Sequence, residues 1–220
     1  SQLLSAKAVE ERGRSRASAS PERTADLEAA LKMFSDLYLK EQQLIAVRNY
    51  ALFYRSNIQA SLGRNEDAID GYQRIADQEG VDILRPLQTE ATTALVKLLG
   101  EQQKFPVAID RGEKWLAASR PDEQSSNEIL ELRLEMAQLK IAWSQELSSK
   151  DSSDRVASRL VRDTRSELRS LLRFPGAHQE SARVLLAELG VETVEQTNRE
   201  LPAVHNFTEA VAAAQERIER

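Results

Sequence analysis

The sequence predicts an all-α protein built from a series of amphipathic helices. Only eight glycines and six prolines occur in 220 residues, and long stretches are rich in Ala, Leu, Glu, Gln and Arg, which lose little side-chain freedom in a helix. Apolar residues recur at spacings of three and four, and no segment shows the alternating pattern of a half-buried strand. We therefore expect helices throughout and no substantial sheet.

Composition narrows the classes of function. With 41% hydrophobic and 30% charged residues, the chain is suited to one extended domain with a continuous core. No apolar run approaches the roughly 20 residues of a membrane-spanning helix. The net charge of −5 argues against general nucleic-acid binding, and the absence of cysteine excludes disulfides, a thiolate nucleophile and a cysteine-based zinc site. Because Ser1 is not Met and no signal-like stretch follows it, we expect a processed protein or an excised domain.

The elements follow from periodicity and turn residues. A short helix is expected over residues 1–11, and the small, basic residues 12–21 are expected to form a mobile link that folding does not require. A helix then begins at Pro21, since proline is tolerated in the first helical turn, and ends near residue 39. Further helices are expected over residues 41–62, 65–78, 83–99, 105–119, 125–147, 153–173, 177–189 and 207–218.

Three parts of the chain can be distinguished on this basis. Residues 1–21 form the N-terminal helix and basic linker, residues 22–190 a helical repeat domain, and residues 191–220 a linker with a C-terminal capping helix. Several side-chain oxygens are placed to accept from first-turn amides as N-caps: Asn65, Ser125 or Ser126, and Ser152 or Ser153.

Residues 52–75 contain two amphipathic runs separated by Gly63-Arg64-Asn65, the pattern of a helical hairpin. Such a hairpin cannot bury its apolar face alone and implies neighbours of the same kind. A second unit, 40 residues further on, repeats the Ala68-Ile69 pair as Ala108-Ile109. Alanine lets two helix backbones approach closely, so we expect Ala68 and Ala108 to be buried at helix crossings. The large, small and turn positions resemble those of the tetratricopeptide family: Leu52, Ser56, Gly63, Ala68, Ile69 and Tyr72.

The resemblance covers residues 43–189 and implies a right-handed α-α superhelix, a solenoid of antiparallel helix pairs whose usual work is protein binding. The units are about 40 and 54 residues long, compared with 34 in the family, and the family's first-helix Trp is Leu52 here. Phe174-Pro175-Gly176, followed by Ala182 and Leu186, is similar to a repeat junction of tetratricopeptide lipoproteins and periplasmic proteins of the bacterial envelope. It implies a bacterial protein of the periplasm or cell envelope rather than the cytoplasm.

The resemblance also places a candidate binding groove. Tyr50, Phe53 and Asn57 are expected to face it, where aromatic side chains bury much area at little rotamer cost. Phe53 could instead be a core residue packed on the preceding helix. A C-terminal carboxylate ligand is not expected, because the Lys that binds one in part of the family is Phe53 here and the Asn of the next repeat falls on Ala94.

A second candidate surface is an arginine ladder in the helix expected over residues 153–173. Its six members fall within roughly 120° of one helix face: Arg155, Arg159, Arg162, Arg165, Arg169 and Arg173. One interpretation is a cationic strip for an acidic peptide, a phosphate-bearing ligand or anionic lipid. The other is a solvated face that Asp163 and Glu167 partly compensate.

The sequence shows no catalytic or metal-binding pattern, and neither a cofactor nor a metal is expected. His178 and His205 are 27 residues apart, and Trp115 and Trp143 lie in apolar helical patterns typical of core residues. No phosphate-binding loop or nucleophile elbow occurs. We expect a non-catalytic scaffold or adaptor that binds a protein or peptide segment, with no nucleic-acid partner and no membrane span. Two alternatives are an accessory domain of a larger enzyme and an anionic-ligand module using the ladder; the oligomeric state stays open.

Overall fold

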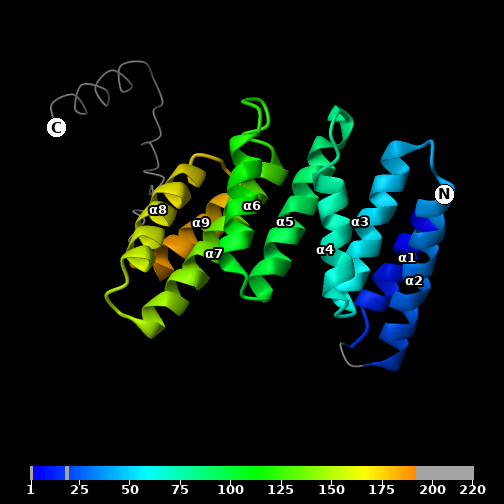
Figure 1. Ribbon diagram of the computed structural model, residues 1–220, viewed down its shortest axis with the longest axis horizontal. Coiled ribbons are helices and arrows are strands. Elements are labelled where there is room, and N and C mark those ends of the chain that lie inside the picture. The colour runs from blue at the N-terminus through cyan, green and yellow to red at the C-terminus, as the bar shows by residue number, and fades with distance from the viewer. Residues whose placement is uncertain (1, 18–19, 192–220) are drawn as a thin grey trace, which may run out of the picture.

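The computed structural model describes residues 2–17 and 20–191, and within them it contains only helices (Figure 1). The all-α prediction is confirmed. The elements are α1 (Gln2–Arg14), α2 (Pro21–Lys40), α3 (Ile45–Ser61), α4 (Asn65–Ala76), a short 3-10 helix η1 (Asp82–Leu84), α5 (Arg85–Glu101), α6 (Phe105–Ala117), α7 (Asn127–Lys150), α8 (Arg155–Leu171) and α9 (Ala177–Glu188). The helix expected over residues 207–218, and His205, lie outside the described residues.

The helices pack in chain order, each against the next. In addition, each odd-numbered helix contacts the following odd-numbered one, from α1 through α3, α5 and α7 to α9. Figure 1 shows the resulting single row, with α1 and α2 at one end and α8 and α9 at the other. The surface formed by α1, α3, α5, α7 and α9 is called the odd-helix face below.

Two consecutive hairpins, α3–α4 and α5–α6, repeat the same geometry 40 residues apart. Helices α3 and α5 have 17 residues each. Both end in a turn closed by matching backbone hydrogen bonds, in which the amide of Arg64 donates to Gln59 at 2.8 Å and that of Lys104 to Leu99 at 2.9 Å. Ala68 and Ala108 are fully buried, as expected from the shared Ala-Ile pair. The repeat predicted from sequence is therefore present in the backbone.

Helix α7 joins two parts of the core. One set of its residues, including Leu132 and Met136, packs in a cluster with α3 to α6, and another, including Leu134 and Ile141, packs with α8 and α9. The α6 backbone approaches α7 so closely that a Cβ added at Gly112 would lie 2.1 Å from the Met136 sulfur. Contact of this kind fixes the distance between the two helices.

The structure corrects several expectations about the chain's local elements, the first of which is the end of the N-terminal helix. Helix α1 continues past residue 11 to Arg14, with Gly13 buried and Arg12 and Arg16 both bound to Asp26 of α2. Arg12 and Arg16 of the expected link are thus paired with a carboxylate of the next helix, and Arg14 is paired with Glu10 of α1 itself.

Among the N-caps, Ser126 is confirmed because its hydroxyl accepts from the Ile129 amide. Helix α8 is capped by Asp154, whose carboxylate accepts from the amides of Val156 and Ala157, rather than by Ser152 or Ser153. Asn65 is the first residue of α4 and does not cap it.

Candidate functional site

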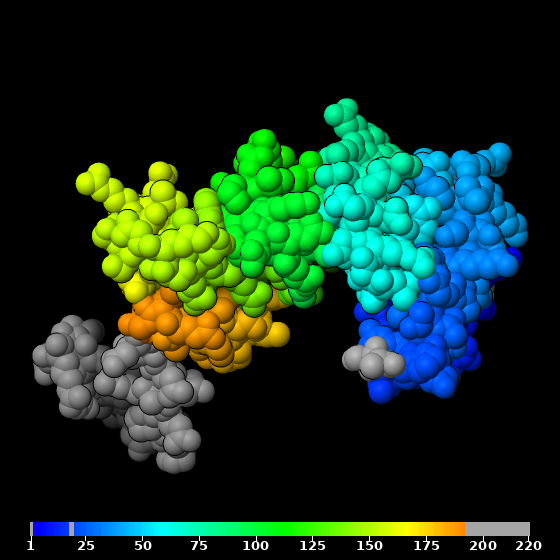
Figure 2. Space-filling view, turned by 60° about the horizontal axis from the view of Figure 1, so that its bottom comes forward, coloured from blue at the N-terminus to red at the C-terminus, as the bar shows by residue number. Residues whose placement is uncertain are grey.

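The row of helices is arched over a hollow. Figure 2 shows α9, in orange, and the α1–α2 pair, in blue, on either side of this hollow, with the middle helices between them as its roof. Elongated partners bind well in concave surfaces of stacked helices, because many side chains can contact them at once. Successive odd-numbered helices contact one another along the row and so form one continuous surface, which makes the odd-helix face the first candidate for a binding surface.

A pair of stacked tyrosines lies on α3 at this face. The ring centroids of Tyr50 and Tyr54 are 6.4 Å apart, and Tyr54 also stacks on Phe34 of α2 at 5.3 Å. The ammonium of Lys7 on α1 lies 4.7 Å from the Tyr54 ring centroid. Both tyrosines are partly buried, so they present rigid aromatic surface with part of it open to solvent.

The other two residues predicted for the groove have different surroundings. Phe53 is 9% exposed and packs against the ring of Tyr72. Of the two locations considered for it, the groove and the core, the structure therefore shows the core. Asn57 is partly buried, and its side-chain oxygen accepts a 2.6 Å hydrogen bond from the Tyr72 hydroxyl. Of the three, Tyr50 presents the most suitable surface for a partner.

Carboxylates of α5 and α7 act electrostatically on Tyr50. Burial and the nearby Glu90 raise the pKa of Tyr50, with a further contribution from Glu128. Burial, together with the charge of Glu128, raises the pKa of Glu90, and burial likewise raises the pKa of Glu135 on α7. Within the described ranges, none of these three glutamates forms an ion pair. At Glu90 the charge of Lys7 acts against the rise in pKa but is a smaller influence than burial and Glu128. A partly desolvated carboxylate of this kind is a group that a bound cation would stabilise.

Tyr54, Glu90 and Glu128 were not among the site residues predicted from the sequence. For Tyr54 and Glu90 the sequence does contain a pattern that indicates their position. Tyr54 follows Tyr50 by four residues and therefore lies on the same side of α3. The 40-residue repeat carries the position of Tyr50 onto Glu90, so the spacing of the repeat indicates that the two share a face, although this was not among the expectations drawn from the sequence. No such signal identifies Glu128, because α7 starts after a longer connection that breaks the 40-residue spacing.

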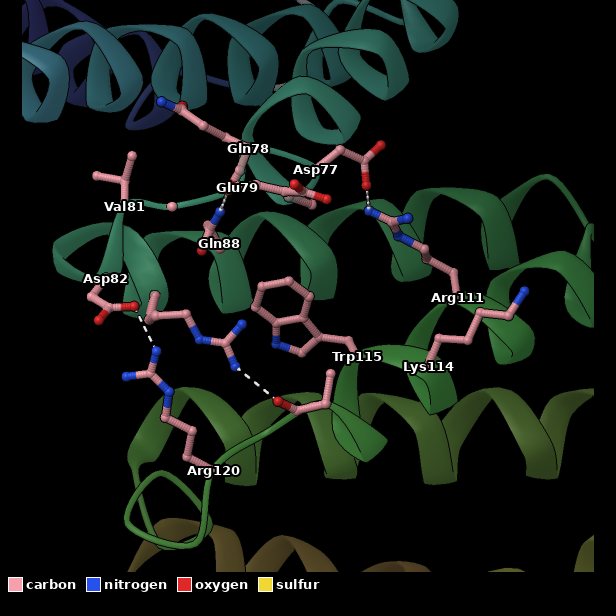
Figure 3. Close-up of a pocket in the computed structure, with 14 residues that line it drawn as sticks. Asp77, Gln78, Glu79, Val81, Asp82, Gln88, Arg111, Lys114, Trp115 and Arg120 are labelled. Atoms are coloured by element: carbon pink, nitrogen blue, oxygen red, sulfur yellow. Dashed lines mark hydrogen bonds and ion pairs between the residues drawn. The ribbon is translucent and has the colours of Figure 1, made fainter.

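A second hollow, about 600 Å³ in volume, lies between the α4–α5 connection and α6 (Figure 3). Trp115 stands at its centre and donates its indole N–H to the Thr89 hydroxyl at 3.1 Å. The guanidinium of Arg85 lies 4.4 Å from the Trp115 ring centroid. Trp115 and Trp143 are both partly buried against the main core cluster, in keeping with their apolar spacing.

The cations of this second hollow are already paired. Arg111 binds Asp77, Arg120 binds Asp82 at 2.5 Å, and Arg85 binds Glu123 at 2.8 Å. The hydrogen bond from Arg85 is the main reason that the pKa of Glu123 falls to about 2. These pairs connect residues 34 to 38 positions apart, so they bind one hairpin to the next. We interpret the hollow as a structural junction.

The arginine ladder divides into two groups. Arg155, Arg159, Arg162 and Arg169 are exposed on α8, and Arg173 is exposed just beyond its end. Arg165 is instead directed at α9, where it donates to the Leu189 carbonyl oxygen at 2.5 Å. Glu167, expected to compensate the ladder, binds the buried Lys140 of α7 at 2.8 Å.

The described residues contain no group of three His, Cys, Asp or Glu side chains that could hold a metal ion. In the same part of the chain, no helix combines the length and the apolar character needed to cross a membrane. Comparison with protein families, curated proteins and solved structures finds no match to the chain. The resemblance to tetratricopeptide proteins thus rests on the residues of the sequence alone.

Proposed function

We propose that the chain is a non-catalytic scaffold of the tetratricopeptide type that binds a protein or peptide segment on its odd-helix face. One observation carries the proposal. Tyr50 stacks on Tyr54, and burial together with the charges of Glu90 and Glu128 raises the pKa of Tyr50, so side chains from α3, α5 and α7 combine aromatic surface with negative charge. Aromatic anchors and charge of one sign are the usual means by which such surfaces select a partner.

The right-handed superhelix is part of the same proposal. It is supported by the contacts between successive odd-numbered helices and by the repeated α3–α4 and α5–α6 hairpins. In an array of this kind, the first helix of each pair lines the inner surface, which corresponds here to the odd-helix face. A segment lying across it would cross several helices and contact each of them through a few side chains.

The chemistry of the face indicates what the segment carries. Carboxylates without cationic partners favour Lys or Arg, and a ring or aliphatic side chain would cover the open part of the tyrosine pair. We therefore propose that the partner segment combines basic with aromatic or aliphatic residues. Because the carboxylates are partly desolvated, these ion pairs would be screened less by salt than pairs on an open surface.

The experiment is a selection of peptides from a random display library on the immobilised chain. Selected peptides are expected to be enriched in Lys or Arg and in aromatic residues. Their affinity is then measured by fluorescence anisotropy for the wild type, for Tyr50→Ala and for the double variant Glu90→Gln/Glu128→Gln. Each variant is expected to weaken binding on the order of tenfold, as loss of an anchor at an interface does.

Asp36→Asn is the matched control, since it removes an exposed carboxylate from the outer helix α2. It is expected to leave the affinity unchanged. Selected peptides that bind wild type and both odd-face variants equally well, or that lack basic residues, would refute the proposal.

A further inference from the structure

The outer side of α8 carries a regular row of four exposed arginines. Arg155, Arg159, Arg162 and Arg169, here called the arginine strip, are separated by four, three and seven residues. With Ser166 in the gap, the spacing becomes four, three, four and three, which is that of the seam between two packed helices. The strip extends over 15 residues, and its two ends are about 21 Å apart along the helix.

The charge of the strip is poorly compensated. Arg159 and Arg162 share one carboxylate, Asp163, and each Nε lies 3.4 Å from its oxygens, which is long for a charge-assisted hydrogen bond. Arg155 and Arg169 have no ion-pair partner within the described residues. The other acid of α8, Glu167, is bound to Lys140 of α7. The strip is therefore a local excess of positive charge on a chain whose net charge is −5.

A shallow hollow of about 230 Å³ borders the strip between α6 and α8. Ile109, Val156 and Leu160 supply apolar surface to it, and Arg159 and Asp163 stand at its edge. Val156 is 49% exposed, so a partner's side chain could reach it.

The walls of this hollow are held together by a buried cation. Lys140 of α7, with only 6% of its side chain exposed, binds Glu113 of α6 at 3.0 Å and Glu167 of α8 at 2.8 Å. The two outer helices are thus fixed to the helix between them, and the hollow exists before a partner arrives. A preformed site loses less conformational entropy on binding.

We propose that the arginine strip and the adjoining hollow are a docking site for an acidic α-helix of a protein partner. Its Glu or Asp residues at heptad spacing would pair with the strip, and one aliphatic side chain would enter the hollow at Val156. This surface is distinct from the odd-helix face, so the inference goes beyond the proposed function.

Two features favour a protein helix over other anions. The apolar part of the hollow, at Val156 and Leu160, matches an aliphatic side chain of a helix, whereas a phosphate backbone would leave it uncovered. The apolar side of α8, including Leu168 and Leu171, is fully buried in the core and is not free to enter a lipid bilayer.

The test uses a synthetic helical peptide of 21 residues with Glu at heptad spacing and one Leu toward the hollow. A second peptide has the same composition in scrambled order. Affinity for the chain of residues 1–220 is measured by isothermal titration calorimetry at low and at physiological salt. We expect the patterned peptide to bind more tightly than the scrambled one and to lose about tenfold in affinity as salt rises. The triple variant Arg159→Gln/Arg162→Gln/Arg169→Gln should weaken binding at low salt about tenfold.

The control variant Lys32→Gln/Lys40→Gln/Arg74→Gln removes the same charge from exposed positions on α2 and α4 and should bind like the wild type. Val156→Ser should weaken only the patterned peptide, by a few-fold, while circular dichroism of every variant matches the wild type. Equal affinity for both peptides, equal loss in both triple variants, or tighter binding to vesicles of anionic lipid or to duplex DNA would overturn the proposal. So would salt-sensitive dimerisation of the chain through the strip, seen by sedimentation.

Discussion

Gln103 adopts the left-handed backbone conformation that Gly63 adopts one repeat earlier, with φ of 60° and 75° respectively. Each residue follows the end of a 17-residue helix and donates its amide to a carbonyl of the last turn, Gln103 to Gly100 at 2.8 Å and Gly63 to Ala60 at 3.0 Å. Glycine adopts this conformation without a Cβ penalty, whereas glutamine does not. The second hairpin thus makes the same turn as the first, with glutamine in place of the glycine that suits this conformation.

This comparison predicts a stabilising substitution. Gln103→Gly should raise the free energy of unfolding by about 1 kcal/mol, because relief of the left-handed strain outweighs the greater freedom of glycine in the unfolded chain. Urea denaturation followed by circular dichroism provides the measurement. The matched control is Gln102→Gly, one residue earlier at φ −84°, which should destabilise the protein. The same sign for both substitutions would show that Gln103 is unstrained.

The Arg85–Glu123 pair predicts a dependence of stability on pH. The pKa of Glu123 falls from 4.5 to about 2, chiefly through the hydrogen bond from Arg85. A carboxyl with a lowered folded pKa contributes stability above about pH 4.5 and loses it as pH falls toward 2. Wild type should therefore exceed Glu123→Gln in stability by about 1 kcal/mol at pH 7, with the difference vanishing near pH 2. Asp122→Asn, at the neighbouring exposed carboxylate, should show no such difference; a gap between wild type and Glu123→Gln that is constant over this range would contradict the assignment.

Substitution of Glu90 by Gln should stabilise the folded chain and weaken its binding of basic peptides. Its raised pKa, caused by burial and by Glu128, means that the charged carboxylate is unfavourable in the folded chain at neutral pH. Glu90→Gln should therefore raise the free energy of unfolding at pH 7 by roughly 0.5 kcal/mol, with the gain fading as pH falls through the folded pKa. The same variant should bind the selected basic peptides more weakly. Asp36→Asn should change neither quantity, and a Glu90→Gln protein that is less stable at pH 7 would argue that this carboxylate has a structural partner.

The packing of the N-terminal helix α1 predicts that residues 1–20 contribute to the stability of the chain. Ala6 is fully buried in a cluster with Leu27 and Phe34, and Arg12 and Arg16 bind Asp26. Removal of residues 1–20 should therefore lower the stability by on the order of 2 kcal/mol through exposure of that cluster. Leu4→Ser, at a side chain that is 65% exposed, should have little effect in the same thermal melts. A truncated chain with the same melting temperature as the wild type would show that residues 1–20 are not required for folding.

Periodicity predicted the helices and one repeat of this fold because both are properties of short stretches of chain. The Ala-Ile pair at residues 68–69 and 108–109 was enough to align two hairpins, since alanine marks the crossing of two helices. What periodicity could not supply was the identity of each side chain's neighbour. Spacing placed Arg165 on the same face as Arg162, but its carbonyl acceptor at Leu189 belongs to the next helix.

Contacts between helices also decided which predicted site residues are accessible, and periodicity does not give these contacts. Phe53 and Tyr50 both lie on α3 at positions facing other helices, and only the packing of Tyr72 against Phe53 decides which of them is buried. Glu167 was expected to offset the ladder because it is near in sequence, yet it binds Lys140 on a different helix. Partners that come from other elements are set by tertiary packing, and a single sequence does not specify them.

The most direct test of the central claim is a map of where a selected basic peptide contacts the chain. Backbone amide chemical shifts are recorded by NMR during titration with the peptide. We expect the amide chemical shifts to change on the odd-helix face and to stay constant on α2 and α4. The largest changes should surround Tyr50 and Tyr54 of α3, Glu90 of α5 and Glu128 of α7. Shifts confined to the outer helices at saturating peptide, or none near Tyr50 and Glu90, would contradict the claim that this face is the binding surface.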